Sequence, residues 1–146
     1  MTLPIGLASA LFNTVLEALR ASPAITAYVG DRIYDVPLED AKPPYLFFGP
    51  AGFTDARDWG CANAWRFRLR LYVSTAHHGR LVAWDIGLAI AAALHEQTPP
   101  VPVPGFHLPM SITVINGGDI IDPLKLKEVF IDIDAVMAAD PPPDQP

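Results

Sequence analysis

The 146-residue chain carries 16 acidic and 10 basic residues, which gives a formal net charge of −6. A surface that is acidic on balance has no global positive field for nucleic acid or anionic lipid, so the charge argues against DNA binding by the surface as a whole. Hydrophobic residues make up 51% of the chain and charged residues 18%. This balance is typical of one folded domain with an ordinary core, and not of a disordered chain.

The cysteine count and the hydropathy of the sequence limit the classes of protein to which the chain can belong. The one cysteine, Cys61, excludes an intramolecular disulfide and therefore the disulfide-rich extracellular scaffolds. The longest apolar run, Ile86 to Leu94, falls well short of the roughly 20 residues that a membrane helix needs. The apolar N-terminus has no positive residue ahead of its apolar run, so we interpret it as the first helix of the fold and not as a signal peptide. We expect a soluble protein without a membrane partner.

The first thirty residues predict two helical segments. Apolar residues at three- and four-residue spacing predict a helix over residues 5–21. Ser22 and Pro23 then predict one further helical turn over 23–28, with Ser22 as its N-cap and Gly30 just beyond its end.

Two short strands are predicted next, at residues 32–34 and 45–48, and the Gly49-Pro50 pair is predicted to close the second. The segment between them, 36–44, is a charged loop in which residues before proline favour extended backbone. We expect it to form a rigid surface loop that a neighbouring subunit could contact. Its candidate interface residues are Glu39 and Asp40.

The clearest strand of the chain is predicted at residues 65–73, where side chains alternate between two faces. Residues 52–64, which precede it, predict either a long hairpin loop or two strand ends splayed beyond the sheet. Ser74 and Thr75 are predicted to end the strand. One face holds Phe67, Leu69, Leu71 and Val73, and the other holds Tyr72 with an arginine stripe made of Arg66, Arg68 and Arg70.

A second main helix is predicted over residues 78–96, and it is apolar around most of its circumference. Such a helix is expected to be buried on more than one side, by the sheet and first helix together or by a partner subunit. The proline-rich segment 97–109 predicts an extended connector, and the last strands are predicted at 111–115 and 128–137. These elements predict a single α+β domain over residues 1–138, followed by a disordered proline-rich tail over 139–146.

Two explanations of the arginine stripe stay open. Strand 128–137 presents Glu128, Asp132 and Asp134 at the same alternation, so antiparallel neighbours would pair these charges for about 0.2–1 kcal/mol each. Alternatively, the stripe faces a negatively charged lumen, DNA or an acidic neighbouring molecule. A mixture of aromatic and arginine residues typical of interfaces also occurs in the preceding loop, where packing against its own domain is an equal alternative. Those residues are Phe53, Arg57 and Trp59.

No group of residues predicts catalysis, a cofactor or a metal site. His77 and His78 are neighbours that point apart, and His95 lies about 25 Å further along the predicted helix, so these histidines do not predict a shared metal. His107, the fourth histidine, lies beyond that helix. Cys61 lacks the local signature of a cysteine hydrolase. The segment 117–119 predicts a turn and not a phosphate-binding loop. The aspartates Asp35, Asp55 and Asp58 suit turns better than paired acid–base chemistry.

Several motifs carry a family resemblance. They are the run Gly30-Asp31-Arg32-Ile33-Tyr34-Asp35-Val36-Pro37, then Pro44-Tyr45-Leu46 closing at Gly49, then the long strand 67–74, the helix led by Gly79 and a strand near the C-terminus. In these motifs, over roughly residues 5–137, the chain resembles the small tail-completion proteins, also called tail terminators, of long-tailed phages, prophages and gene transfer agents. The connector 97–109 and the tail after Ala139 depart from that pattern.

The resemblance implies a structural protein and not an enzyme, with no cofactor. The implied fold is α+β, with a mainly antiparallel sheet of about four to five strands and two main helices packed on one face. The implied assembly is a hexameric ring of the protein with itself, at the head-proximal end of the tail tube. There it would stop polymerisation of the tail tube protein, meet the head-tail connector and let DNA pass through its lumen. The implied location is the virion or phage-like particle, at the head-tail junction, after assembly in the bacterial cytoplasm.

Two other classes of function remain as alternatives. A head-side connector or neck adaptor would also form a ring, but it would dock on the portal. A small enzyme or ligand-binding domain would need a pocket with convergent polar groups, and the sequence supplies no cluster that predicts one.

Overall fold

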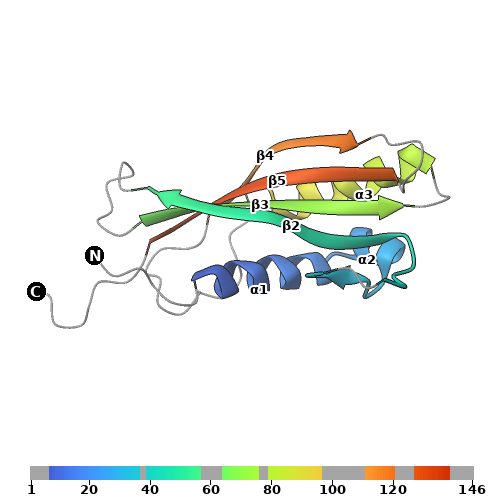
Figure 1. The fold of residues 1–146 in the computed structure, drawn as a ribbon, viewed down its shortest axis with the longest axis horizontal. Helices are drawn as coiled ribbons and strands as arrows, with labels where there is room; N and C mark the ends of the chain where they lie inside the picture. The colour runs from blue at the N-terminus through green and yellow to red at the C-terminus, as the bar shows by residue number, and fades with distance from the viewer. Residues whose placement is uncertain are drawn as a thin grey trace, which may run out of the picture.

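The computed structural model describes residues 7–36, 39–56, 64–75, 79–96, 111–120 and 127–138, which form three helices and five strands (Figure 1). In chain order these are α1 (Leu7–Arg20), α2 (Pro23–Val29), β1 (Ile33–Tyr34), β2 (Tyr45–Asp55), β3 (Ala64–Thr75), α3 (Gly79–Leu94), β4 (Ser111–Ile120) and β5 (Lys127–Ala138). The predicted connector over 97–109 and tail over 139–146 lie outside the described residues.

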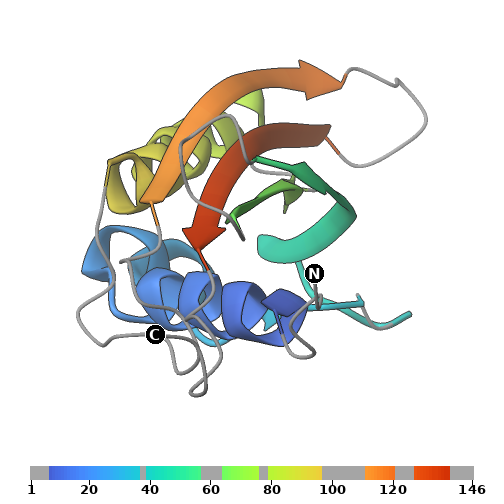
Figure 2. The same cartoon turned by 90° about the vertical axis from the view of Figure 1, so that its left-hand side faces the viewer.

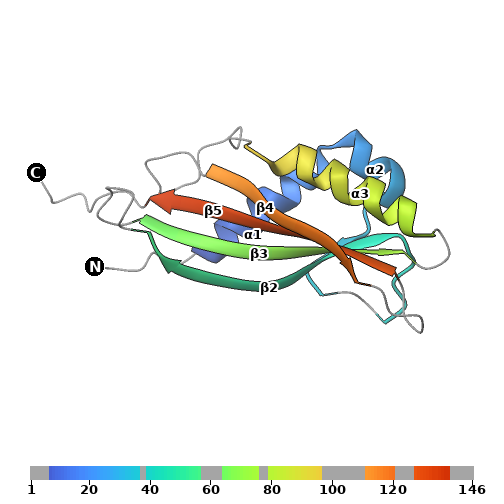
Figure 3. The same cartoon turned by 90° about the horizontal axis from the view of Figure 1, so that it is seen from above.

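The strands form one mixed sheet in the order β1-β2-β3-β5-β4. The short β1 runs parallel to β2, and every other neighbouring pair is antiparallel. The three helices lie on one side of the sheet, and no described helix covers the other side (Figures 2 and 3). The predicted α+β fold with a mainly antiparallel sheet is therefore confirmed, and α2 adds a third, shorter helix.

The core lies between the helices and the inner face of the sheet. The predicted apolar positions of α1, which include Leu11, Val15 and Leu19, are fully buried. The alternation predicted for β3 is confirmed, because its four apolar residues face this core while Arg68 is exposed. Alternate residues of β5 complete the layer, and Phe12 of α1 stacks on Phe48 of β2 with ring centroids 5.7 Å apart. Burial at this scale, at roughly 25 cal/mol per Å² of apolar surface, is the main term that stabilises the fold.

The start and end of α2 agree with the local sequence. Ser22 has the extended backbone of an N-cap, and its carbonyl accepts hydrogen bonds from the Ile25 and Thr26 backbone N–H groups and from the Thr26 hydroxyl. Its own side chain makes no capping hydrogen bond. Gly30 ends the helix with a φ of 59°, a left-handed conformation that glycine adopts without a Cβ penalty.

Two predicted strand ends were wrong. Strand β2 does not end at Gly49 and Pro50 but continues to Asp55, because the register shifts between Phe48 and Ala51 and this bulge accommodates the proline. Gly49 is required there, since a Cβ would lie 2.4 Å from a ring carbon of Tyr72. At the other end of the sheet, β3 includes Ser74 and Thr75, both fully buried, which were predicted to break it.

The segment 117–119 is also part of a strand and not the predicted turn. Strand β4 runs through it to Ile120 after a register shift between Val114 and Asn116. A Cβ at Gly118 would lie 3.0 Å from the Phe130 ring of β5, so the missing side chain makes room for that ring. The two glycines serve close packing of the sheet.

Helix α3 packs on the sheet and on both other helices through one side. The buried residues of this side are Ala83, Ile86, Gly87, Ile90 and Leu94. A Cβ at Gly87 would lie only 2.8 Å from the Val129 side chain, so the helix approaches β5 closely at this point. Within the described residues, none of the three helices is long and apolar enough to cross a membrane.

Candidate interface surfaces

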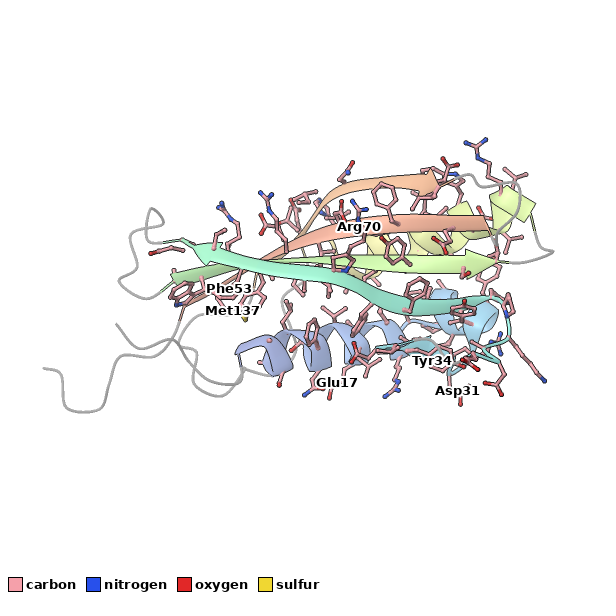
Figure 4. The ribbon with its side chains drawn as sticks, in the orientation of Figure 1. Glu17, Asp31, Tyr34, Phe53, Arg70 and Met137 are labelled. Atoms are coloured by element: carbon pink, nitrogen blue, oxygen red, sulfur yellow. The ribbon has the colours of Figure 1, made fainter. Side chains whose placement is uncertain are left out.

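The sheet has an open face, defined here as the face that carries no described helix. Alternation places the outward-pointing residues of β3 and β5 on it, and these are mostly charged or aromatic. Figure 4 shows Arg70 near the middle of the sheet, with Tyr34 and Phe53 toward opposite ends of the molecule. The arginine stripe predicted from the sequence therefore lies on the face that no described helix covers.

An aromatic row crosses the open face near one end. It consists of Tyr34, Phe47, Tyr72 and Phe130, which are register partners in turn from β1 to β5. Phe47 stacks on Tyr72 with centroids 4.9 Å apart, and Tyr45 lies 6.0 Å from Tyr34 and 5.9 Å from Phe47. Aromatic pairs of this kind contribute about 0.5–1.5 kcal/mol each beyond burial. The row joins the strands across the sheet without any helix on that side.

Arg70 belongs to the structure of the sheet itself. Its Nε and Nη2 donate to the two carboxylate oxygens of Asp132 at 2.8 and 3.1 Å, and its guanidinium lies 4.1 Å from the centre of the Phe130 ring. The Asp132 hydrogen bonds raise the pKa of Arg70, and Arg70 in turn lowers the pKa of Asp132. Asn116 of β4 donates a further, longer hydrogen bond to Asp132 at 3.4 Å. Three strands are thus tied together at one charged site.

The other two arginines of the stripe differ from each other. Arg66 lies 3.4 Å from Asp134, although its Nε makes no well-aligned hydrogen bond. Arg68 is exposed and forms no ion pair with any described residue. Glu128, the third expected partner, lies opposite Ser74 and not opposite an arginine. Ion pairs within the sheet therefore account for Arg66 and Arg70. Arg68 lies opposite Asp134 in the register, but its exposed guanidinium forms no ion pair with a described residue on the open face.

The remaining predicted interface residues do not join this group. Phe53 is 53% exposed and stacks on Phe67 at 5.6 Å, with Trp65 edge-on at 6.0 Å, so it caps the far end of the β2–β3 pair. Glu39 and Asp40 are exposed before β2 begins, toward the opposite end of that strand from Phe53. Arg57 and Trp59 lie outside the described residues, as do Cys61, Asp58, His77, His78 and His107.

A second exposed surface was missed by sequence reasoning. We define the α3 ridge as Leu81, Asp85 and Leu88, whose leucines are 78% and 60% exposed. The sequence placed both leucines on one side of the helix but gave no sign that this side would be uncovered, because the helix is apolar nearly all round.

An anchor at the start of α3 fixes the orientation of the ridge. The Arg80 Nε and the Trp84 Nε1 both donate to the same oxygen of Asp119 in β4, the tryptophan at 3.0 Å. These two hydrogen bonds lower the pKa of Asp119. The first two turns of the helix are therefore tied to the edge strand of the sheet.

At its other end α3 bonds to the free edge of β4. The Glu96 N–H donates to the Ile112 carbonyl at 2.9 Å, and the Val114 N–H donates to His95 Nδ1 at 3.1 Å. In the part of the chain that the structure describes, no three histidine, cysteine or acidic side chains lie together as ligands of a metal would. His95 thus has a structural contact in this fold.

The fold is a small α+β domain with one helical face and one open face. The family model "Tail completion protein gp17" matches residues 13–138, so the chain belongs to this family of tail-completion proteins. A solved chain described as "Virion of native gene transfer agent (GTA) particle" has the same fold, with a TM-score of 0.76 at 21% identity over 92% of this chain and 98% of that one. No curated protein matches. The resemblance found in the motifs is confirmed, and the chain is a structural protein of phage-type tails.

Proposed function

We propose that the protein is a tail terminator, which forms a ring at the head-proximal end of the tail tube, stops tube polymerisation and joins the tail to the head connector. The observation that carries the proposal is the extent of the family match, which runs from within α1 to the last residue of β5 and so includes the whole sheet. A tail-completion protein acts at the end of the tube. A terminator must bind that end without itself extending the tube.

The surfaces of the subunit support assembly into a ring. The open face and the α3 ridge are exposed, and each combines a charge with apolar or flat surface, as interfaces do. The low share of charged residues leaves little repulsion between copies. The ring is a hexamer in this proposal, and its lumen lets DNA pass from head to tail.

A purified-component experiment tests the function. The protein is added to tail tube subunits as they polymerise, and tube lengths are measured by negative-stain imaging. A terminator gives tubes of limited length with one capped end, and the number of capped ends rises with the amount of protein added. Tubes that keep growing, together with binding of the protein to portal rings, would instead identify a head-side connector.

The role of Arg68 in that assay follows from its position. Because Arg68 is exposed and forms no ion pair with a described residue, R68E is expected to impair ring assembly or tail joining while the isolated fold persists. The new carboxylate lies opposite Asp134, so a small loss of stability is expected as well. The matched control is R20E, a charge reversal at an exposed residue in the last turn of α1, on the helical side of the sheet. Unchanged capping by R68E would remove Arg68 from the proposed interface.

A further inference from the structure

The α3 ridge and the open face lie on opposite sides of the subunit. At 100° per residue, the residues of the ridge are on the side of α3 directly opposite its buried residues Ala83, Ile86 and Ile90, which face the sheet. The ridge therefore points away from the sheet. Figures 2 and 3 show that α3 itself lies on the side of the sheet opposite to the open face.

Each surface carries one charge that forms no ion pair with a described residue. Asp85 is exposed between Leu81 and Leu88 and forms no ion pair with a described residue. Among the three arginines of the stripe, Arg68 alone forms no ion pair with a described residue. It lies opposite Asp134 in the register, but Asp134 contacts Arg66 instead. The two unpaired charges have opposite signs, and they lie on opposite surfaces.

The surface beside Arg68 has no bulky side chain at Gly52, so a helix can lie against it. Gly52 lies directly across the β2–β3 pair from Arg68, and nothing lies within 4 Å of where its Cβ would be. Pro50 and Thr54, on either side of it, are exposed. The leucines of the ridge are about 10 Å apart along the helix, at 1.5 Å per residue. A helix laid here can place one leucine on each side of the arginine.

We propose that the α3 ridge of one copy docks on the open face of the next copy, with Asp85 pairing with the neighbour's Arg68 and the two leucines resting beside Gly52. This inference rests on the proposed ring and names the contact that builds it. Two different patches on opposite sides of a subunit make a heterologous contact, which repeats from copy to copy and closes when the rotation between copies divides a circle.

The proposed pairing of Asp85 with the neighbour's Arg68 predicts that assembly lost through one charge reversal is restored by the other. D85R alone sets two positive charges against each other at every contact, and R68E alone sets two negative charges, so each purified variant is expected to bind itself at least about tenfold more weakly than the wild type. An equimolar mixture can alternate the two variants, and every contact then has opposite charges. Assembly should return in the mixture and also in the double variant D85R/R68E.

Sedimentation velocity of the full chain measures the outcome, with circular dichroism to show that each variant is folded. E17R and R20E are the matched controls, because both change exposed α1 residues away from the two surfaces, as Figure 4 shows for Glu17. L81S/L88S is expected to weaken assembly without any rescue by the charge variants.

Three results would overturn the proposal: a wild type that remains monomeric at every concentration, single variants that assemble normally, or single variants that fail and are not rescued by mixing. The tube assay keeps this inference separate from the proposed function. Wild-type protein that assembles through this contact and leaves tubes uncapped would refute the function alone. Variants that stay assembled and cap tubes would refute the contact alone.

Discussion

Arg70 holds Asp132 with two hydrogen bonds across neighbouring strands while its guanidinium rests 4.1 Å from the centre of the Phe130 ring. The aspartate side chain is only 20% exposed, and Asn116 of the next strand also donates to it. The ion pair between Arg70 and Asp132 therefore helps to stabilise the sheet. It also neutralises Arg70, which the sequence alone suggests as an interface residue.

Removing the carboxylate should therefore destabilise the protein. D132A leaves the Arg70 charge without its partner, and we expect the free energy of unfolding to fall by about 1–2 kcal/mol, a value reduced for partial exposure. Urea unfolding followed by tryptophan fluorescence measures it. D134A is the comparison, and its effect should be smaller because Asp134 lies 3.4 Å from Arg66 without a well-aligned bond. Equal losses for both variants would contradict this account.

The same pair predicts a dependence of stability on pH. Arg70 lowers the pKa of Asp132 from its ordinary value of 3.8, so the stabilisation is complete above the unfolded-state pKa and is lost as the pH falls through the lower folded-state pKa. Unfolding free energies should decline below about pH 4, and D132N should show a shallower decline. Asp119, whose pKa Arg80 and Trp84 also lower, should supply part of the decline that remains. The raised pKa of Arg70 adds nothing in this range because the guanidinium stays charged.

Gly49 should be the more sensitive of two neighbouring glycines in β2. A Cβ there overlaps the Tyr72 ring, so G49A should displace the aromatic row and cost about 1–3 kcal/mol. G52A is the matched control, because no atom lies within 4 Å of its Cβ position, and it should change stability little. Near-ultraviolet circular dichroism reports the tyrosines directly. A G49A spectrum and midpoint like those of G52A would show that the row tolerates the added carbon.

Gly87 offers a test of how closely α3 lies on the sheet. Alanine improves helix propensity by about 1 kcal/mol, but its Cβ would overlap the Val129 side chain, so the two effects oppose each other in G87A. In a V129A background the overlap is gone, and the same G87A change should become stabilising. A double-mutant cycle by thermal unfolding measures the difference. Additive effects of the two substitutions would contradict the close contact.

The sequence predicted what depends on local periodicity. The alternation of β3 and the apolar spacing of α1 fix which side chains face the core, and both are present in the structure. Gly and Pro correctly predicted the start and end of α2, but inside the sheet they were less reliable, because Gly49, Gly117 and Gly118 make room for side chains of neighbouring strands. Those neighbours are known only once the strands are paired. Packing across the sheet therefore outweighed the local turn propensity of these residues.

The candidate site was predicted in part for the same reason. The arginine stripe and its possible aspartate partners could be read from the sequence, but the register is needed to place Arg70 opposite Asp132 and Arg68 opposite Asp134. The side-chain geometry then decides that Asp134 contacts Arg66 and not Arg68. The α3 ridge could not be predicted, since a helix apolar on every side does not reveal which side the rest of the chain will cover.

The bonds between the end of α3 and β4 have a further consequence for how copies can meet. β4 is the long edge strand of the sheet, and an open edge invites another chain to add a strand. His95 and Glu96 occupy the backbone groups of Val114 and Ile112, so the first half of that edge is closed to strand addition. At the other edge, β1 is only two residues long and pairs with Leu46 and Phe47, so β2 continues to Asp55 without a described strand on that side. A subunit proposed to halt the growth of a tube thus closes half of one long sheet edge to the hydrogen bonds by which its own sheet could grow.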